Sequence, residues 1–196
     1  MQPAKVNYKI YQGGTFQETY RWESQTKVYA PIQTIAKSAP CVITTNTVHQ
    51  LPANWRFRVV GAGGMKEINS VGDNYYIGTE VTANTITINQ VNSLLYTQYT
   101  NGGVVEYNQP VPLAGLSARM QLRETVESSV VLYEATSTAG QIVLDNITKT
   151  ITLTIPGSVT SGFTFLTAVY SLELYDATKV IPFLVGNITL VPEVTR

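Results

Sequence analysis

Strict alternation of apolar and polar residues is the pattern that most constrains the fold of this chain. Over residues 116–123 one apolar set falls on one face of an extended strand: Leu116, Ala118, Met120 and Leu122. The same period recurs over residues 150–155, with Ile151, Leu153 and Ile155 on one face. It recurs again over residues 166–174, with Leu166, Ala168, Tyr170, Leu172 and Leu174. A two-residue period is typical of half-buried antiparallel strands, so we predict an all-β protein.

Turn residues separate these runs. Residues 175–179 are expected to form a hairpin loop, and Val180–Val191 a last strand pair or one long bent strand. Pro182 and Gly186 indicate an edge position or a bulge in that segment. No window carries a capped helical stripe, and the only helical turn we expect is a short one within residues 93–99.

Two changes in amino-acid composition along the chain predict an inserted domain. Residues 5–24 form two expected strands around Gly13-Gly14, and a polar, proline-bearing stretch begins near Pro31. A second junction follows, marked by Pro110 and Pro112. We therefore predict a discontinuous antiparallel β-sandwich made of residues 1–30 and 109–196, with a small β-module at residues 31–108. The expected core of that module is Val42, Leu51, Trp55, Phe57, Val59, Ile68, Tyr76, Ile86 and Ile88.

Charge is scarce, which narrows the classes of partner. Charged residues make up 13% of the chain, about half the usual ~25%, and the formal net charge is zero. Without a basic surplus we expect no nucleic-acid partner. No apolar run approaches the length of a membrane helix, and residues 1–5 lack a signal-peptide pattern, so we expect a soluble protein made in the cytoplasm, with no membrane partner. Its uncharged surface favours permanent contact with other proteins.

The chemically reactive side chains do not form a recognisable catalytic or cofactor motif. His49 is the only histidine and Cys41 the only cysteine, too few ligands for a zinc site. Gly61-Ala-Gly-Gly64 resembles a phosphate loop only superficially, since no helix-forming segment follows. Glu124, Glu127 and Glu134 are close in sequence, but their spacing does not identify a glycosidase pair. We expect no enzymatic activity, no cofactor and no metal.

Two sets of residues are candidate interface residues. Tyr75, Tyr96 and Tyr99 are placed near loops of the module, where tyrosine rings bind proteins or sugars well. Thr167, Val169 and Ser171 occupy the outward face of the strand at residues 166–174 and precede its first charge, Glu173. We expect these surfaces to pack on neighbouring subunits.

Two groups of motifs resemble tailed-bacteriophage proteins. The segment Val48-His-Gln-Leu-Pro, then Val60-Gly-Ala-Gly-Gly-Met-Lys-Glu-Ile-Asn69 and Tyr99-Thr-Asn-Gly-Gly-Val104, resembles a small β-module of phage tail proteins. Gln50 stands where that family usually has glycine. The segments at residues 8–22, 113–123 and 170–176, with the C-terminal residues 192–196, resemble small phage virion proteins. In those proteins the equivalent of residues 118–123 follows directly on an N-terminal hairpin.

The resemblance implies an immunoglobulin-like or baseplate-anchor-like sandwich and a structural role in the virion. The expected function is a non-enzymatic tail, baseplate or neck subunit, assembled in the host cytoplasm, that contacts other virion proteins and forms homo-oligomers. Whether such a subunit also anchors fibres is left open by the sequence. Two alternatives remain open at this point. One is a carbohydrate-binding module for a host glycan, and the other is a capsid decoration protein.

Overall fold

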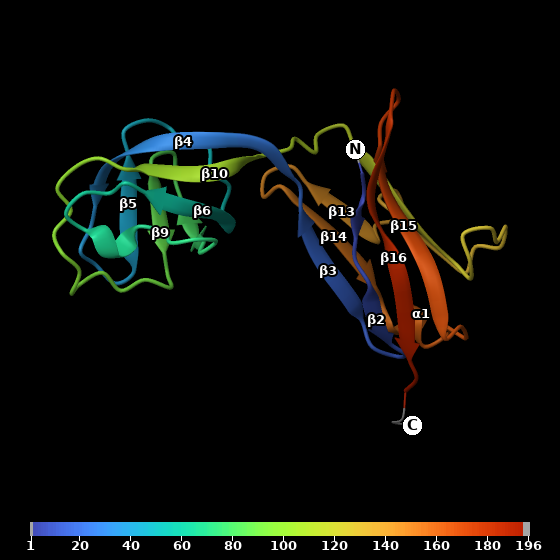
Figure 1. Cartoon of the computed structure of the whole chain (residues 1–196). Helices are drawn as coiled ribbons and strands as arrows, with labels where there is room; N and C mark the ends of the chain where they lie inside the picture. The colour runs from blue at the N-terminus through green and yellow to red at the C-terminus, as the bar shows by residue number, and fades with distance from the viewer. Residues whose placement is uncertain (1, 194–196) are drawn as a thin grey trace. The chain divides into compact units, whose positions relative to one another are not determined.

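The computed structural model describes residues 2–193 and is built almost entirely of strands. Strands account for 49% of the chain and helix for 4%, which confirms the all-β prediction. The chain divides into two compact units (Figure 1). Unit 1 contains Met1–Arg21 and Pro112–Arg196, and unit 2 contains Trp22–Val111.

Unit 1 consists of two β-sheets that pack face to face. The larger sheet contains β1 (Ala4–Lys5), β2 (Tyr8–Tyr11), β11 (Ser117–Arg123), β12 (Tyr133–Thr136), β15 (Thr167–Tyr175) and β16 (Val180–Val191). The smaller sheet contains β3 (Phe16–Arg21), β13 (Ile142–Asp145) and β14 (Thr150–Ile155). A single helical turn, α1 (Gly157–Thr160), follows β14. Pairing within the smaller sheet and along β12, β11, β15 and β16 is antiparallel, as predicted.

The alternating residues form the sandwich core. The apolar sets of β11, β14 and β15 are buried, with Ala118, Met120, Leu122, Ile151, Leu153, Ile155, Ala168, Tyr170, Leu172 and Leu174 all at 4% exposure or less. Two residues of these sets depart from the prediction: Leu116, which precedes β11, is only half-buried, and Leu166 is 71% exposed. Leu166 was expected to share the inward face, but β15 begins only at Thr167, so the pleat that would turn Leu166 inward does not reach it.

The first two strands of unit 1 lie in different sheets. β2 pairs in parallel with β16, whereas β3 pairs antiparallel with β14. The turn at Gly13-Gly14, expected between two strands, therefore crosses from one sheet to the other rather than closing a hairpin. Thr160 of α1 donates a hydrogen bond to the carbonyl oxygen of Gly14 at 2.8 Å. The N-terminal segment thus joins both layers of the sandwich.

Aromatic rings fill the space where these two layers meet. The Tyr8 ring lies 5.3 Å from Phe16 and 5.5 Å from Tyr170, measured between centroids. The Tyr8 and Tyr20 hydroxyls share a 2.6 Å hydrogen bond, and Tyr170 donates to the carbonyl oxygen of Val6 at 2.9 Å. Burial raises the pKa of all three tyrosines, so these hydroxyls stay protonated as hydrogen-bonding groups.

β16 is one long strand with an irregularity, as the sequence indicated for Val180–Val191. Its register against β15 shifts between Leu172 and Glu173, which leaves Phe183 as the extra residue. Gly186 lies against the N-terminal segment: a Cβ atom there would be 1.8 Å from the carbonyl oxygen of Val6. β16 can pair with both β15 and the N-terminal strands only because residue 186 has no side chain.

Unit 2 is a single seven-stranded sheet that curves into a nearly closed barrel. In order of pairing its strands are β7 (Tyr76–Gly78), β6 (Trp55–Val60), β10 (Val104–Pro110), β4 (Glu23–Ile35), β5 (Cys41–Thr45), β9 (Thr85–Ile88) and β8 (Glu80–Val81). β7 and β8, at the two ends of this order, are separated in the chain only by Thr79. The Thr79 N–H donates to the carbonyl oxygen of Thr87 at 2.9 Å, which links the two ends of the sheet.

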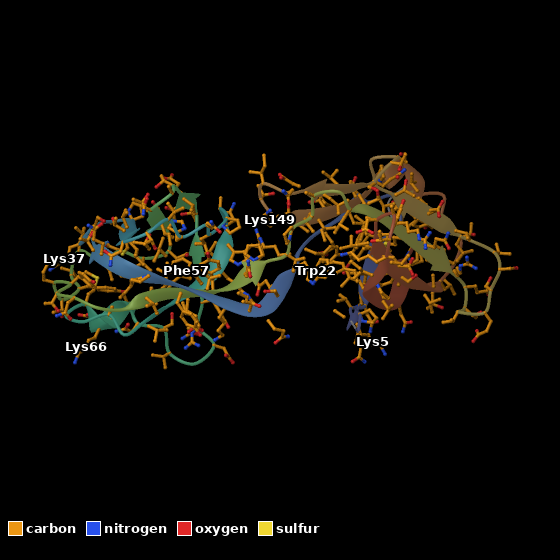
Figure 2. The ribbon with its side chains drawn as sticks, turned by 90° about the horizontal axis from the view of Figure 1, so that it is seen from above. Lys5, Trp22, Lys37, Phe57, Lys66 and Lys149 are labelled. Atoms are coloured by element: carbon orange, nitrogen blue, oxygen red, sulfur yellow. The ribbon has the colours of Figure 1, made fainter. Side chains whose placement is uncertain are left out.

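The barrel has its own hydrophobic core. Trp55, Phe57, Val59, Ile68, Ile86 and Ile88 are fully buried and Leu51 is 3% exposed, as expected. Val42 is only half-buried, so its assignment to the core was wrong: Cys41 and Ile43 point inward instead. Tyr76 packs at the edge of this core. In Figure 2 Phe57 lies among the side chains of unit 2, whereas Lys37 and Lys66 lie at its surface.

Residues 93–99 form a hydrogen-bonded turn and not the helical turn that we expected. The N–H of Tyr96 donates to the carbonyl oxygen of Ser93 at 3.1 Å. The Ser93 side chain is fully buried, and its hydroxyl donates to the carbonyl oxygens of Ala36 and Ser38 at 2.8 and 2.9 Å. Main-chain acceptors from a distant segment fix this turn, which local sequence patterns do not reveal.

The division between the units differs from the expected boundaries at residues 30/31 and 108/109. Both of those positions fall inside strands, β4 and β10, which pair along their lengths from Glu23 to Pro31. The N–H of Val111 donates to the carbonyl oxygen of Trp22 at 3.0 Å. The chain therefore leaves and re-enters unit 1 at one point. Pro31 lies inside β4 and does not mark the first junction, whereas Pro110 and Pro112 flank Val111, the last residue of unit 2.

Removing Trp22–Val111 and joining Arg21 to Pro112 through a short Gly-Ser linker should leave a folded unit 1, because its core contains no residue of unit 2. We expect a β-type circular dichroism spectrum and a cooperative urea transition. A variant that also lacks residues 2–21 is the control, and it should not fold because β1, β2 and β3 would be missing. An unfolded deletion variant with intact N-terminal strands would contradict the independence of unit 1.

Replacing Gly186 with alanine should destabilise unit 1 by about 2 kcal/mol or more, because the added methyl group overlaps the backbone of Val6. Gly162→Ala is the matched control: its Cβ would lie 3.5 Å from the carbonyl oxygen of Val159, an ordinary contact distance. The midpoint of urea denaturation measures both. Equal midpoints for the two variants would show that the N-terminal segment does not approach β16 this closely.

Candidate functional site

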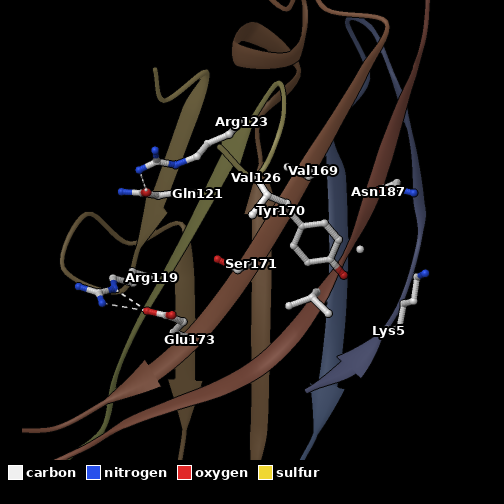
Figure 3. A pocket seen from close by; sticks show the side chains of 12 residues that line it. Lys5, Arg119, Gln121, Arg123, Val126, Val169, Tyr170, Ser171, Glu173 and Asn187 are labelled. Carbon is white, nitrogen blue, oxygen red and sulfur yellow. Dashed lines mark hydrogen bonds and ion pairs between the residues drawn. The ribbon is translucent and has the colours of Figure 1, made fainter. Parts of the chain in front are cut away.

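A groove of about 750 Å³ lies on the outer face of the larger sheet of unit 1 (Figure 3). It crosses β11, β15 and β16 and reaches β1. Twelve residues line it: Lys5, Arg119, Gln121, Arg123, Val126, Val169, Tyr170, Ser171, Glu173, Val185, Gly186 and Asn187. We name this feature the sheet groove.

Strand register places the polar side chains of the sheet groove. The residues that alternate with the buried set in β11 point to the outer face, and each lies opposite an outward residue of β15. Arg119 is paired with Glu173, Gln121 with Ser171, and Arg123 with Val169. On the other side of β15, Val169 is opposite Asn187 and Ser171 is opposite Val185. Strands β1, β11, β15 and β16 therefore form the floor of the sheet groove.

Ion pairing differs along the groove. Arg119 donates to one carboxylate oxygen of Glu173 at 2.8 Å through Nη2 and 3.0 Å through Nε, and it lies 5.3 Å from the centre of the Tyr175 ring. Arg123 donates instead to uncharged acceptors, the side-chain oxygen of Gln121 at 2.8 Å and the carbonyl oxygen of Ser128. The positive charge of Arg119 is balanced within the sheet groove, and that of Arg123 is not.

The side chains that line the sheet groove carry a net positive charge. Its lining contains three cationic side chains and the single carboxylate of Glu173. Lys5 extends from β1 into the region that Figure 3 shows, and within residues 2–193 neither Lys5 nor Arg123 forms an ion pair. The arrangement suits an anionic group that lies beside apolar surface, because Val126, Val169 and Val185 form the remaining lining.

The expected interface residues of β15 are brought partly to this site. Val169 and Ser171 line the sheet groove, Val169 half-buried and Ser171 exposed. Thr167 is exposed at the beginning of β15 and lies outside the lining. Sequence reasoning missed Lys5 and Asn187 as members of this site. Their positions depend on the pairing of β16 with β1 and β15, for which the local pattern carries no signal.

The three module tyrosines have different environments. Tyr75 is 43% exposed, and the Arg56 guanidinium lies 4.8 Å from the centre of its ring. Tyr96 and Tyr99 are partly buried against the barrel core. The Tyr99 hydroxyl also donates to the carbonyl oxygens of Gly102 and Ile32 at 2.9 and 3.2 Å. Of the three, Tyr75 is exposed, whereas Tyr96 and Tyr99 are half-buried.

Ion pairs at the entry to unit 2 have a structural role. Arg56 donates two hydrogen bonds of 2.7 Å to the two carboxylate oxygens of Glu23, and Asn108 donates to the same carboxylate at 3.2 Å. Lys27 pairs with Glu106 across β4 and β10. These contacts connect β4 with β6 and β10, where the chain enters and leaves the barrel.

His49 and Cys41 are both buried in the barrel of unit 2. His49 is 2% exposed, its Nδ1 accepts from the N–H of Leu51 at 3.0 Å, and its carbonyl oxygen accepts from the Tyr107 hydroxyl. Burial raises the pKa of Tyr107 to about 12. Cys41 is fully buried, and burial raises the pKa of its thiol. These contacts give His49 and Cys41 structural positions in the barrel.

The glutamates also have distinct surroundings. Glu134 accepts a hydrogen bond from Gln121 at 2.7 Å, while Glu124 and Glu127 are exposed in the loop after β11. Within residues 2–193 no three histidine, cysteine or acidic side chains are grouped as they would be to hold a metal ion. No helix among those residues is long and apolar enough to cross a membrane.

No protein-family model matches the chain, and no curated protein matches its sequence.

Burial lowers the pKa of His49 below its usual value of 6.5. The unfolded chain therefore takes up a proton near pH 6.5 that the folded chain does not, and the free energy of unfolding should fall as pH is lowered from about 6.5 through the folded-state pKa. Because His49 is the only histidine, proton NMR of its imidazole measures that pKa directly.

His49→Asn is the control, since an asparagine oxygen can still accept from Leu51 without titrating in this range. Its loss of stability between pH 7.5 and pH 5 should be smaller than that of the natural protein. An imidazole midpoint at or above 6.5 would contradict a buried neutral ring.

Proposed function

We propose that the protein is a non-enzymatic structural subunit of a tailed-bacteriophage virion, in the tail, baseplate or neck. It packs on neighbouring subunits through unit 1 and carries unit 2 as an inserted module. The observation that carries this proposal is the contact between the two glycine motifs by which unit 2 resembles phage tail modules.

These motifs lie far apart in the sequence and meet in the barrel. The N–H of Gly63 donates to the carbonyl oxygen of Asn101 at 2.8 Å, and the N–H of Thr100 donates back to Gly63 at 3.0 Å. A Cβ atom at Gly64 would lie 2.1 Å from the carbonyl oxygen of Gln98, and one at Gly103 would lie 2.8 Å from the nitrogen of Ala62. Both positions also have positive φ, so glycine is favoured there by the backbone conformation as well as by the lack of space for a Cβ atom.

The other residues of the first motif have equally specific positions. Asn69 accepts from the N–H of Ala62 at 2.8 Å and donates to its carbonyl oxygen at 3.0 Å, while Met65 and Ile68 are fully buried. Gln50 has a φ of 54°, a left-handed conformation that favours glycine, and it stands where the resembling family usually has glycine. The motif residues are those that this backbone geometry requires, which supports the resemblance.

The arrangement of the two units supports the proposal as well. The tail-module motifs at residues 48–104 lie within unit 2, and the virion-protein motifs at residues 8–21, 113–123 and 170–176 lie within unit 1. Trp22, the last residue of the first of these segments, begins unit 2. Of the C-terminal motif, residues 194–196 lie outside the described residues. The motif groups thus follow the structural units closely.

Incorporation into particles tests the proposal. Val169→Asp should strongly reduce the amount of the protein in virions purified from a phage that carries the altered gene, because it places a carboxylate in the floor of the sheet groove. The fold should survive, since Val169 points outward and lies opposite Arg123. Val143→Asp on β13 is the matched control: Val143 is 54% exposed and lies outside the lining of the sheet groove.

Immunoblots of gradient-purified particles measure incorporation, and gold-labelled antibody locates the protein. Label on the tail supports the proposal, whereas label on the head would favour a capsid decoration protein. Absence of the natural protein from particles would overturn a virion role. Glycan binding by the isolated protein that depends on Tyr75 would instead favour a carbohydrate-binding module.

A further inference from the structure

We infer that the sheet groove binds the loop at residues 124–132 of a second copy of this chain, so that two copies form a reciprocal pair through unit 1. The inference deepens the proposed packing role and rests on it. We name this segment the β11–β12 loop, after the strands that it connects.

The β11–β12 loop presents an unusual exposed surface. It contains four exposed apolar side chains: Val126 at 78%, Val130 at 64%, Val131 at 39% and Leu132 at 38%. Single exposed apolar residues are ordinary, but four within seven positions form a local apolar patch. Such a patch is stabilised when another protein surface covers it.

Hydrogen bonds order this loop in the absence of a partner. The Arg123 guanidinium donates to the carbonyl oxygen of Ser128, and the N–H of Ser128 donates to that of Thr125 at 3.2 Å. At the far end, the N–H of Leu132 donates to the carbonyl oxygen of Leu122 at 2.8 Å. An ordered loop loses less conformational entropy when it binds.

The charges of the loop and the groove are opposite. Glu124 and Glu127 are exposed, and within residues 2–193 they take part in no hydrogen bond or ion pair. The groove presents Lys5 and Arg123, which also form no ion pair there. Two unpaired carboxylates and two unpaired cations of one unit can therefore be satisfied by a second copy.

The position of the loop makes the contact reciprocal. Val126 lines the sheet groove of its own chain, so the loop and the groove are parts of one continuous surface. When two such surfaces face each other across a twofold axis, each loop lies over the groove of the other copy. The valines of the loop then cover Val169 and Val185, and the glutamates approach Lys5 and Arg123.

Charge balance favours a second copy over an unrelated acidic ligand. The net charge of the chain is zero, yet positive charge gathers in the groove and the carboxylates that balance it lie on the adjacent loop. A stable contact buries about 800 Å² of each partner, so the loop and the groove of each copy would both have to be covered in the pair.

Sedimentation of the intact protein over a range of concentrations tests the inference. We expect a monomer–dimer equilibrium that weakens as salt is raised, since part of the attraction is between exposed charges. The dimer dissociation constant should rise about tenfold or more in the variant Glu124→Lys/Glu127→Lys, and likewise in Lys5→Glu.

Matched controls separate local charge from net charge. Asp73→Lys/Glu80→Lys makes the same charge change at exposed positions of unit 2, and Lys9→Glu makes the same change as Lys5→Glu on β2, outside the groove lining. Both controls should dimerise as the natural protein does. An equimolar mixture of Glu124→Lys/Glu127→Lys with Lys5→Glu should dimerise more strongly than either variant alone, because loop and groove charges become complementary again.

Three results would overturn the inference. They are a natural protein that stays monomeric up to about 1 mM at low salt, loop variants that dimerise like the controls, and a mixture with no gain. Binding of a polyglutamate peptide by a monomeric natural protein, lost in Lys5→Glu, would assign the groove to an acidic partner instead. Because sedimentation uses the isolated protein, its failure leaves the virion-labelling result unaffected.

Discussion

The pairing of the N-terminal segment with strands from the far end of the chain is the interaction on which unit 1 depends. β1 and β2 lie beside β16 in one sheet, while β3 lies beside β14 in the other. The Tyr8, Phe16, Tyr20 and Tyr170 rings fill the space between these layers. Without residues 2–21 the smaller sheet would lose an edge strand and the larger sheet would leave β16 unpaired on one side. The two halves of a discontinuous unit are thus held by contacts that bypass unit 2.

This arrangement explains why a complete barrel is tolerated inside the sandwich. The entropy of closing a loop grows only slowly with its length, so the cost depends more on how the ends meet than on what lies between them. Here the ends meet through the hydrogen bond between Val111 and Trp22, and the paired strands β4 and β10 continue it. The Glu23 carboxylate, bound by Arg56 and Asn108, fixes the base of these strands. Each unit can therefore keep its own core.

The outer face of the larger sheet carries the candidate site because β11 and β15 have polar residues where the strand pattern leaves them outward. Arg119 and Glu173 neutralise each other, while Arg123 uses neutral oxygens and orders the β11–β12 loop. The same residue thus contributes charge to the groove and holds the segment beside it. A surface of this kind is suited to contact with protein, because apolar side chains and unpaired charges of both signs lie within a short stretch of the chain.

Much of the local structure could be predicted from sequence, because alternation reports directly which side of a strand is buried. It predicted the all-β class, the inward faces of β11 and β14, the hairpin loop before β16 and the outward positions of Val169 and Ser171. It placed Val42 wrongly because Val42 and Ile43 are adjacent apolar residues, and only pairing with β9 decides which one faces the core. Leu166 was misplaced for a related reason, since a pattern does not show where pairing begins.

Only the tertiary structure decided which strands are neighbours. The sheet groove depends on Lys5, Arg123, Val169 and Asn187 meeting across four strands, and no local pattern encodes the parallel pairing of β1 with β16. The crossing of residues 12–15 between sheets, and the division of the chain at Trp22 and Val111, are likewise settled by long-range hydrogen bonds. The sequence by itself determined the two-residue alternation of apolar and polar side chains, the positions of the turns and the low content of charge. The alternation and the turns depend on residues close together in the chain, and the charge content is a property of composition alone. The register of strands that are distant in the chain follows from packing of the whole unit. That register decides which residues line the sheet groove.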